Sequence, residues 1–209
     1  MKRYDLRSSE LTAEDEREIG RLLREGALII YPTDTLYAIG CCALDGGAVT
    51  RLRAAKKREA DKPMPVIAAD LSQARSLTSR WPDAAQRLAD AFWPGPLTLV
   101  LPAADGLPRS LLAGASSVAA RVPKSSLARA LARLAGPLVA TSANIGGEPP
   151  GLTLDGAIAA FPEAAVAIDV GPLEGAPSTI VDLSAPDGRV SILRFGRIPS
   201  PLVHQALKG

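Results

Sequence analysis

The 209-residue sequence contains few of the side chains on which many hydrolases and metal enzymes depend. Its one histidine, His204, lies five residues from the C-terminus, where chains tend to fray. Its two cysteines, Cys41 and Cys42, are adjacent, so they form neither a metal-binding spacing nor a disulfide framework. We therefore expect no Ser-His-Asp triad, no Cys-His site and no zinc site. Any catalysis must proceed without imidazole or thiolate.

Aromatic residues and long apolar runs are also scarce. Aromatic residues make up 4% of the chain, so a core must be built mainly from alanine, leucine, valine and isoleucine. The longest candidate for a membrane span, residues 91–104, is interrupted by three prolines and a glycine. The first seven residues lack the apolar centre of a secretory signal. We expect a cytoplasmic protein with no membrane contact.

Neither sign of charge is in large excess. The formal net charge is +2, which is too small to make the whole chain a binder of polyanions. Apolar residues make up 47% and charged residues 22%, as is ordinary for a soluble globular protein. The length favours one large domain, residues 1–209, with its own core.

Helical and strand-like patterns alternate along the chain. Thr12 and Asp15 form a candidate capping pair for a helix that Gly26 ends, and Pro82 and Ser125 favour the starts of two further helices. Strand-like stretches occur at 28–31, 65–69, 97–101, 117–122, 137–141, 165–170, 178–182 and 190–194. This order predicts the α/β class, with a mixed sheet.

Positive charge is concentrated in residues 51–62, where six of twelve residues are Lys or Arg. The stretch begins with good helix formers and must end by Pro63. If the backbone is extended beyond the helix, Lys56 and Arg58 share one face while Lys57 points away. Such a pair could clamp a phosphate or carboxylate. A solvated basic helix end is the commoner alternative.

Polar side chains also follow several predicted strands. Thr33 and Thr35 flank a carboxylate after the strand at 28–31, which suits either a small polar ligand or a hydrogen-bonded turn. Ser142 and Asn144 repeat the two-residue spacing after the strand at 137–141. Arg121 has apolar neighbours, so it is either buried and paired or a ligand contact. Polar groups at successive strand ends predict a ligand site there.

Six motifs together resemble, in order, the YrdC-like threonylcarbamoyl-adenylate synthase family. They are Tyr31–Thr35, Lys56–Arg58, Phe92–Thr98, Thr141–Asn144, Ser178–Asp182 and Ile192–Arg194. The resemblance runs from about residue 28 to residue 198, and each motif alone is weak. It implies a single YrdC-like domain with a twisted mixed β-sheet flanked by helices and a deep basic cavity. It also implies the short form, without the additional C-terminal domain of longer relatives.

The same resemblance implies an activity and its partners. The family makes threonylcarbamoyl-adenylate and pyrophosphate from L-threonine, bicarbonate and ATP. The product serves the threonylcarbamoyladenosine modification of transfer RNA, through a downstream tRNA threonylcarbamoyl-transferase complex. Mg²⁺ is expected to arrive with ATP, and no metal site built from the protein alone is expected. A weak contact with tRNA or other RNA is left open.

Site residues are carried over by position. Lys56 and Arg58 match the family's basic pair and would clamp the phosphates as catalytic residues. The other matches are ATP contacts at Lys62, Ser117, Asn144 and Arg194, and threonine contacts at Thr35, Arg121, Ser142 and Ser178. Each has a structural alternative: Thr35 could only close its turn, Ser142 could only cap, and Arg194 could be a surface cation.

Four positions depart from the family pattern. Ala38 stands where a glycine is frequent, Lys62 where asparagine is frequent, and Pro150 where many relatives have serine. Ile67 stands where some relatives place a histidine that meets threonine. The strictness of amino-acid selection is therefore open.

Two rival functions come from other classes. A non-catalytic RNA-binding module would use residues 51–62 to hold a phosphate backbone, with salt-sensitive binding and no ATP turnover. The absence of interleaved aromatic residues in that stretch counts against it. A carbamoyl-adenylate-handling domain of the hydrogenase-maturation type normally accompanies zinc-finger-like and acyl-phosphatase portions, for which this chain has neither the length nor the cysteines.

Overall fold

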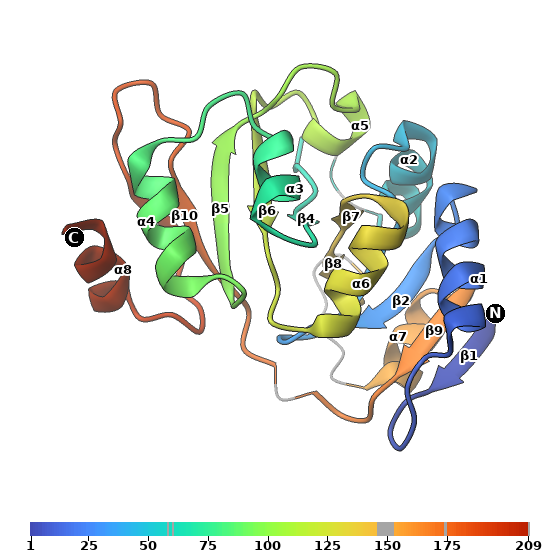
Figure 1. The fold of residues 1–209 in the computed structure, drawn as a ribbon. Coiled ribbons are helices and arrows are strands. Elements are labelled where there is room, and N and C mark those ends of the chain that lie inside the picture. Colours follow the sequence, from blue (N-terminus) through green and yellow to red (C-terminus); the bar gives the residue numbers. More distant parts are fainter. Residues whose placement is uncertain (58, 60, 146–152, 174, 209) are drawn as a thin grey trace.

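The computed structural model describes residues 1–57, 59, 61–145, 153–173 and 175–208. These residues form an α/β domain with two mixed β-sheets flanked by helices (Figure 1). Within the described part of the chain, no helix is both long and apolar enough to cross a membrane. The predicted α/β class is confirmed, but the one sheet expected from the sequence is divided into two.

The two sheets differ in size and draw strands from distant parts of the chain. In spatial order, the five-stranded sheet contains β1 (Lys2–Asp5), β9 (Val166–Asp169), β2 (Ile29–Pro32), β3 (Tyr37–Gly40) and β8 (Thr141–Ser142). The six-stranded sheet contains β11 (Ser191–Arg194), β10 (Thr179–Asp182), β5 (Leu97–Pro102), β6 (Ser117–Arg121), β4 (Val66–Ile67) and β7 (Leu138–Val139). Both sheets combine parallel and antiparallel pairs.

The sheets are joined through the segment that the sequence predicts as one strand, residues 137–141. Strand β7 pairs with β4, whereas β8 pairs with β3 in the other sheet. Ala140 lies between them, and its N–H donates to the carbonyl of Pro65 at 2.9 Å. Apolar pattern alone cannot reveal this change of partner, because both halves are extended and largely buried.

Eight helices of the described chain enclose the sheets. They are α1 (Ala13–Arg24), α2 (Gly46–Ala55), α3 (Leu71–Ser76), α4 (Asp83–Phe92), α5 (Arg109–Leu112), α6 (Ser126–Ala135), α7 (Leu154–Ala160) and α8 (Ser200–Lys208). Helices α1 and α6 share an apolar cluster with β2. Helices α4 and α8 share another with β5 and β10, at the side of the domain where the C-terminus lies (Figure 1).

Three strands of the six-stranded sheet separate an apolar core from a cavity. In β5, Leu97, Leu99 and Leu101 pack in the cluster with α4 and α8, whereas Thr98 and Val100 line the cavity. This alternation is expected, because successive side chains of a strand point to opposite faces. The cavity-side residues of β6 and β10 are Ser117, Ala119, Arg121, Ile180 and Asp182, with Ser178 directly before β10.

Local sequence signals are confirmed where their partners lie nearby in the chain. Thr12 and Asp15 form a reciprocal capping box at the start of α1, and Gly26 follows the end of that helix with φ +84°. Ser125 caps α6, since its hydroxyl accepts a hydrogen bond from the N–H of Ala128. These caps fix where the helices begin and end without help from the distant chain.

Some elements were not predicted. Residues 33–40 were expected as a loop, but Tyr37–Gly40 form β3 and pair antiparallel with β2. The polar segment Lys2–Asp5 forms β1, which pairs in parallel with β9 at the sheet edge. The short helices α3, α5 and α7 and the C-terminal α8 were also missed. The hairpin is the important omission, because its turn carries Thr33 and Thr35.

Candidate functional site

A cavity of about 590 Å³ is lined by residues from both sheets. Its hydroxyl-bearing residues are Thr33, Thr35, Tyr37, Thr98, Ser117, Thr141, Ser142 and Ser178. The charged residues that line it are Arg121, Arg194 and Asp182. A concave site with a few convergent polar groups is the usual form of a small-molecule site. The basic character expected of the cavity rests on the two arginines and stays a prediction.

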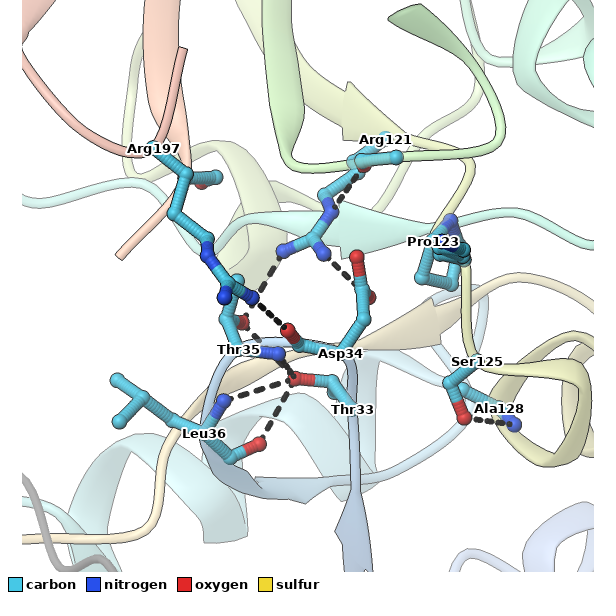
Figure 2. Close-up of polar contacts among 12 residues, drawn as sticks. Thr33, Asp34, Thr35, Leu36, Arg121, Pro123, Ser125, Ala128 and Arg197 are labelled. Atoms are coloured by element: carbon cyan, nitrogen blue, oxygen red, sulfur yellow. Dashed lines mark hydrogen bonds and ion pairs between the residues drawn. The ribbon is translucent and has the colours of Figure 1, made fainter. Parts of the chain in front are cut away.

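Arg121 lies at the end of β6, is 7% exposed and reaches the turn between β2 and β3 (Figure 2). Its Nε donates to the carbonyl of Gly95 at 2.8 Å, and its Nη1 donates to Oγ1 of Thr35 at 3.2 Å. Its Nη2 forms an ion pair with Asp34, which is also largely buried. Burial lowers the pKa of the Arg121 guanidinium, and the Asp34 carboxylate opposes that shift. Arg121 is therefore both paired and part of the cavity wall.

The turn that holds Asp34 is organised by Thr33 (Figure 2). Its Oγ1 accepts from the N–H groups of Thr35 and Leu36, both at 3.1 Å, and donates to the Leu36 carbonyl at 2.8 Å. The hydroxyls of Thr33 and Thr35 lie 2.9 Å apart. Nη1 of Arg197 donates to the carbonyl of Asp34 at 2.9 Å. The turn is thus hydrogen-bonded, as the sequence allowed, and it also lines the cavity.

A second arginine lies against Ser178. Nε of Arg194 donates to the Ser178 carbonyl and Nη2 to the Ser178 hydroxyl, both at 3.0 Å. That hydroxyl also lies 2.9 Å from Oγ1 of Thr98. Partial burial lowers the pKa of Arg194, and the positive charge of Arg121 lowers it further. The two cavity arginines are therefore close enough for the positive charge of Arg121 to affect the pKa of Arg194.

Lys56 lies behind the cavity wall, not among the residues that line it. It is 3% exposed, and its ammonium donates to the carbonyls of Ser142 at 2.7 Å and Asn144 at 2.6 Å. The sequence predicted that Lys57 would point away from Lys56 because the backbone beyond the helix is extended. That reason is wrong. Helix α2 ends at Ala55, Lys56 keeps helical angles and Lys57 turns into the left-handed region with φ +49°. Lys57 is exposed, as expected, but because the helix ends there.

Other predicted ATP contacts have different placements. Ser117 lines the cavity at the start of β6. Lys62 is exposed and its ammonium bonds to Glu59 at 2.8 Å, while Asn144 donates to the carbonyl of Ile145 at 3.0 Å. Neither lines the cavity. Arg58 lies outside the described residues, as does Pro150.

Ile67 supplies an apolar part of the cavity wall and is 2% exposed. It lies in β4, where it pairs in register with Arg121 of β6. Ala38 of β3 also lines the cavity and pairs with Ser142. The departure from the family at position 67 is thus close to the arginine predicted to meet threonine.

Sequence reasoning left out three residues of this site. Asp34, flanked by two threonines, was noted but given no role, although a buried arginine in an apolar strand requires an acidic partner. Thr98 and Asp182 were inside recognised motifs, and the alternation of β5 and β10 could have placed both on the side of Arg121.

The described residues contain no cluster of three or more His, Cys, Asp or Glu side chains able to hold a metal ion. Asp182 is the carboxylate among the described residues that line the cavity. Mg²⁺ is commonly held by one or two carboxylates together with water and substrate phosphates. This donor set fits a magnesium ion that enters with a nucleotide, and does not fit a closed metal site.

Backbone packing at Gly196 supports the Ser178–Arg194 pair. A methyl group added at Gly196 would lie 2.4 Å from the Pro177 carbonyl oxygen and 2.5 Å from the Thr179 nitrogen. Gly196→Ala should therefore shift the backbone around Ser178 and cost about 1–3 kcal/mol of folding stability. Thermal unfolding measures this cost. Gly46→Ala is the control, because its nearest contact would be an ordinary 3.4 Å. Equal melting temperatures for Gly196→Ala and the wild type would contradict the packing argument.

Comparisons with known proteins agree on one family. The model of the Sua5/yciO/yrdC family, described as telomere recombination, matches residues 21–196. The chain is 44% identical over 128 residues to the threonylcarbamoyl-AMP synthase of Pyrococcus abyssi, covering 61% of this chain and 38% of that protein. It is 38% identical over 187 residues to a putative threonylcarbamoyl-AMP synthase of Mycobacterium tuberculosis, covering 88% of this chain and 85% of the relative.

A solved structure shares almost the whole fold. The crystal structure of Pyrococcus abyssi Sua5 complexed with L-threonine superimposes with a TM-score of 0.92 at 34% identity. The match covers 99% of this chain and 61% of that one. The chain thus spans less than two thirds of the Pyrococcus protein, and most of the length of the Mycobacterium relative.

Proposed function

Since the chain belongs to the Sua5/yciO/yrdC family, we propose that it is an L-threonylcarbamoyladenylate synthase. It would convert L-threonine, bicarbonate and ATP into threonylcarbamoyl-AMP and pyrophosphate, which makes it a nucleotidyltransferase. The observation that carries the proposal is a cavity in which a buried arginine and several hydroxyls meet, in a fold closely similar to a threonine-bound relative.

We propose that threonine binds at the Arg121 side of the cavity. A guanidinium has five N–H donors, and the contacts with Gly95, Asp34 and Thr35 use three of them. The two that remain can bind a carboxylate. Ser142 and Ser178 also line the cavity and are the further proposed contacts of the amino acid, although the Ser178 hydroxyl is shared with Arg194 and Thr98.

The reaction needs positioning more than a protein nucleophile. Threonine and bicarbonate combine to a carbamate with loss of water, and a carbamate oxygen attacks the α-phosphorus of ATP as the bond to pyrophosphate breaks. The protein's part is to hold two anions in line and stabilise the charge that develops. This agrees with a chain whose one histidine is exposed on α8.

We propose that ATP binds at the Arg194 and Ser117 side. Its further proposed contacts are Lys62, Asn144 and the pair Lys56 and Arg58. Lys56 would act largely through the carbonyls of Ser142 and Asn144. Mg²⁺ bound to the phosphates would neutralise part of their charge, with Asp182 of the cavity lining as its candidate carboxylate.

The product is proposed to pass, in the cytoplasm, to a tRNA threonylcarbamoyl-transferase complex. Direct RNA binding has less support, because the basic segment 51–62 uses part of its charge internally. Arg51 donates to the Gly26 carbonyl and Arg53 to the Lys62 carbonyl, both at 2.8 Å, and Lys56 is buried. Lys56 is therefore not available to a phosphate backbone, whereas Arg51 stays exposed and keeps its charge.

Pyrophosphate release from ATP tests the proposal, with threonine and bicarbonate omitted in turn. We expect release only when both are present. Release without threonine would contradict the proposed reaction. No release under any condition, together with tight salt-sensitive RNA binding, would favour the RNA-binding alternative.

Selection of threonine should not depend on Ile67. An apolar contact discriminates by only about 1–3 kcal/mol, whereas a site that reads a hydroxyl discriminates by orders of magnitude. Because hydroxyls of Thr35, Ser142 and Ser178 line the cavity, we expect threonine to be favoured over valine by about a hundredfold or more.

Adenylation rates with threonine, serine and valine check this expectation in the wild type, in Ile67→His and in the apolar control Ile67→Val. All three proteins should keep the threonine preference. Weak preference in the wild type that sharpens in Ile67→His would show instead that position 67 sets selectivity.

A further inference from the structure

The cavity contains two arginines with different electrostatic partners. Arg121 is ion-paired with Asp34, and both side chains are largely buried, at 8% and 13% exposure. Arg194 donates to the carbonyl and hydroxyl of Ser178, and within the described chain no carboxylate lies within ion-pair distance of it. The guanidinium of Arg121 is therefore compensated by an ion pair, whereas that of Arg194 is not.

Asp34 lies behind Arg121 and is not among the residues that line the cavity. Its carboxylate reaches Arg121 from the turn, whose backbone is fixed by Thr33 and by Arg197 (Figure 2). Arg197 is itself exposed and, like Arg194, adds positive charge near Arg121. Asp34 thus offsets the charge of Arg121, the one of these three arginines with which the described chain shows it ion-paired.

A buried ion pair is a weak source of stability, so the pair calls for another explanation. The proposed substrates differ in charge: threonine is a zwitterion without net charge, whereas ATP and pyrophosphate carry several negative charges. An uncompensated Arg121 would attract phosphate as strongly as a carboxylate, since a guanidinium binds both with the same fork. With Asp34 in place, Arg121 offers directed hydrogen bonds and little net charge.

We propose that Asp34 is a specificity-determining residue that neutralises Arg121, so that this end of the cavity accepts a zwitterionic amino acid and rejects phosphate anions. This inference rests on the proposed function, because it takes threonine to bind at Arg121. Phosphate groups are thereby directed to the Arg194 end. Selectivity of this kind arises in two ways: the site attracts phosphate less because Arg121 is neutralised, and it still hydrogen-bonds to threonine.

Calorimetric titration with L-threonine and with inorganic phosphate tests the proposal on the intact chain without turnover. In the wild type, threonine should bind and phosphate should not displace it from the Arg121 end. Asp34→Asn keeps the shape of the side chain but removes its charge. Phosphate should then compete with threonine about tenfold more strongly, or more, because the charge of Arg121 is no longer offset.

Asp187→Asn is the matched control. It also removes one negative charge, but from an exposed ion pair with Arg189, so the competition should match the wild type. Asp34→Asn could lose stability, since it leaves a buried cation unpaired. A double variant, Asp34→Asn with Arg121→Gln, removes both charges of the pair. Because it also removes the proposed threonine contact, direct phosphate binding is measured in it, and this binding should fall to the wild-type level or below.

The outcomes are distinguishable. If the wild type binds no threonine, both this inference and the proposed threonine site are wrong. If the wild type binds threonine and Asp34→Asn discriminates against phosphate as well as before, only the role of Asp34 is wrong. Stronger phosphate binding by the double variant than by the wild type would also overturn it, because Arg121 would then not be the source of attraction.

Discussion

Lys56→Met is expected to lower both stability and adenylate formation. The ammonium of Lys56 is buried and holds the carbonyls of Ser142 and Asn144 from behind the cavity wall. Methionine fills much of the same space but donates no hydrogen bond, so both carbonyls lose a charged donor. Each buried group left unsatisfied costs about 1–3 kcal/mol. We expect a melting temperature lower by about 5–15 °C.

Adenylate formation should fall further than stability alone explains. The segment that Lys56 supports carries Ser142, and a displacement of about 1 Å in such a site can reduce the rate about a hundredfold. The measurement is pyrophosphate release at a temperature where the variant is still folded. If Lys56 were only the phosphate clamp expected from the sequence, its loss would lower activity and leave the fold intact. Its burial changes that expectation.

Lys57→Met is the matched control, because it removes the same charge at the next residue. Lys57 is exposed, so neither melting temperature nor rate should change appreciably. Equal losses in the two variants would show that net positive charge matters and that the buried contacts do not. No loss in either would contradict the role of Lys56.

Arg121→Lys should raise the threonine requirement far more than the ATP requirement. Lysine keeps the positive charge but has no planar fork, so it cannot contact Gly95, Thr35 and Asp34 together and still bind a carboxylate with two donors. A charge-assisted hydrogen bond contributes about 1.5–3 kcal/mol. Loss of one should raise the KM for threonine about tenfold to a hundredfold.

Saturation curves for threonine and for ATP decide the point. Arg189→Lys is the control, because Arg189 is exposed and lies outside the cavity lining. An increase confined to the KM for ATP would mean that Arg121 belongs to the nucleotide part of the site.

The features predicted correctly from the sequence depend on nearby residues. The capping box at Thr12 and Asp15 and the cap at Ser125 need partners three residues away. The strand at 97–101 was predicted as well. Its alternation, from which no prediction was made, separates Leu97, Leu99 and Leu101 from the cavity side. Such signals predict where a helix or strand lies in the sequence, but not which other elements pack against it.

The features that were missed depend on distant partners. The change of sheet at Ala140 follows from pairing with β4 on one side and β3 on the other. Burial of Lys56 follows from the end of α2 meeting the carbonyls of a segment 86 residues away. The pair of Asp34 with Arg121 joins two separate sheets across 87 residues. None of these contacts leaves a periodic mark in the sequence.

Incorporation of labelled bicarbonate tests the central claim most directly. The wild-type protein is incubated with ATP, Mg²⁺, threonine and labelled bicarbonate, and the products are separated after rapid quenching and identified by mass spectrometry. We predict one adenylate product that contains both threonine and the labelled carbon, formed in step with pyrophosphate. A threonyl-adenylate without the label, or pyrophosphate release with no labelled adenylate, would contradict the proposed function.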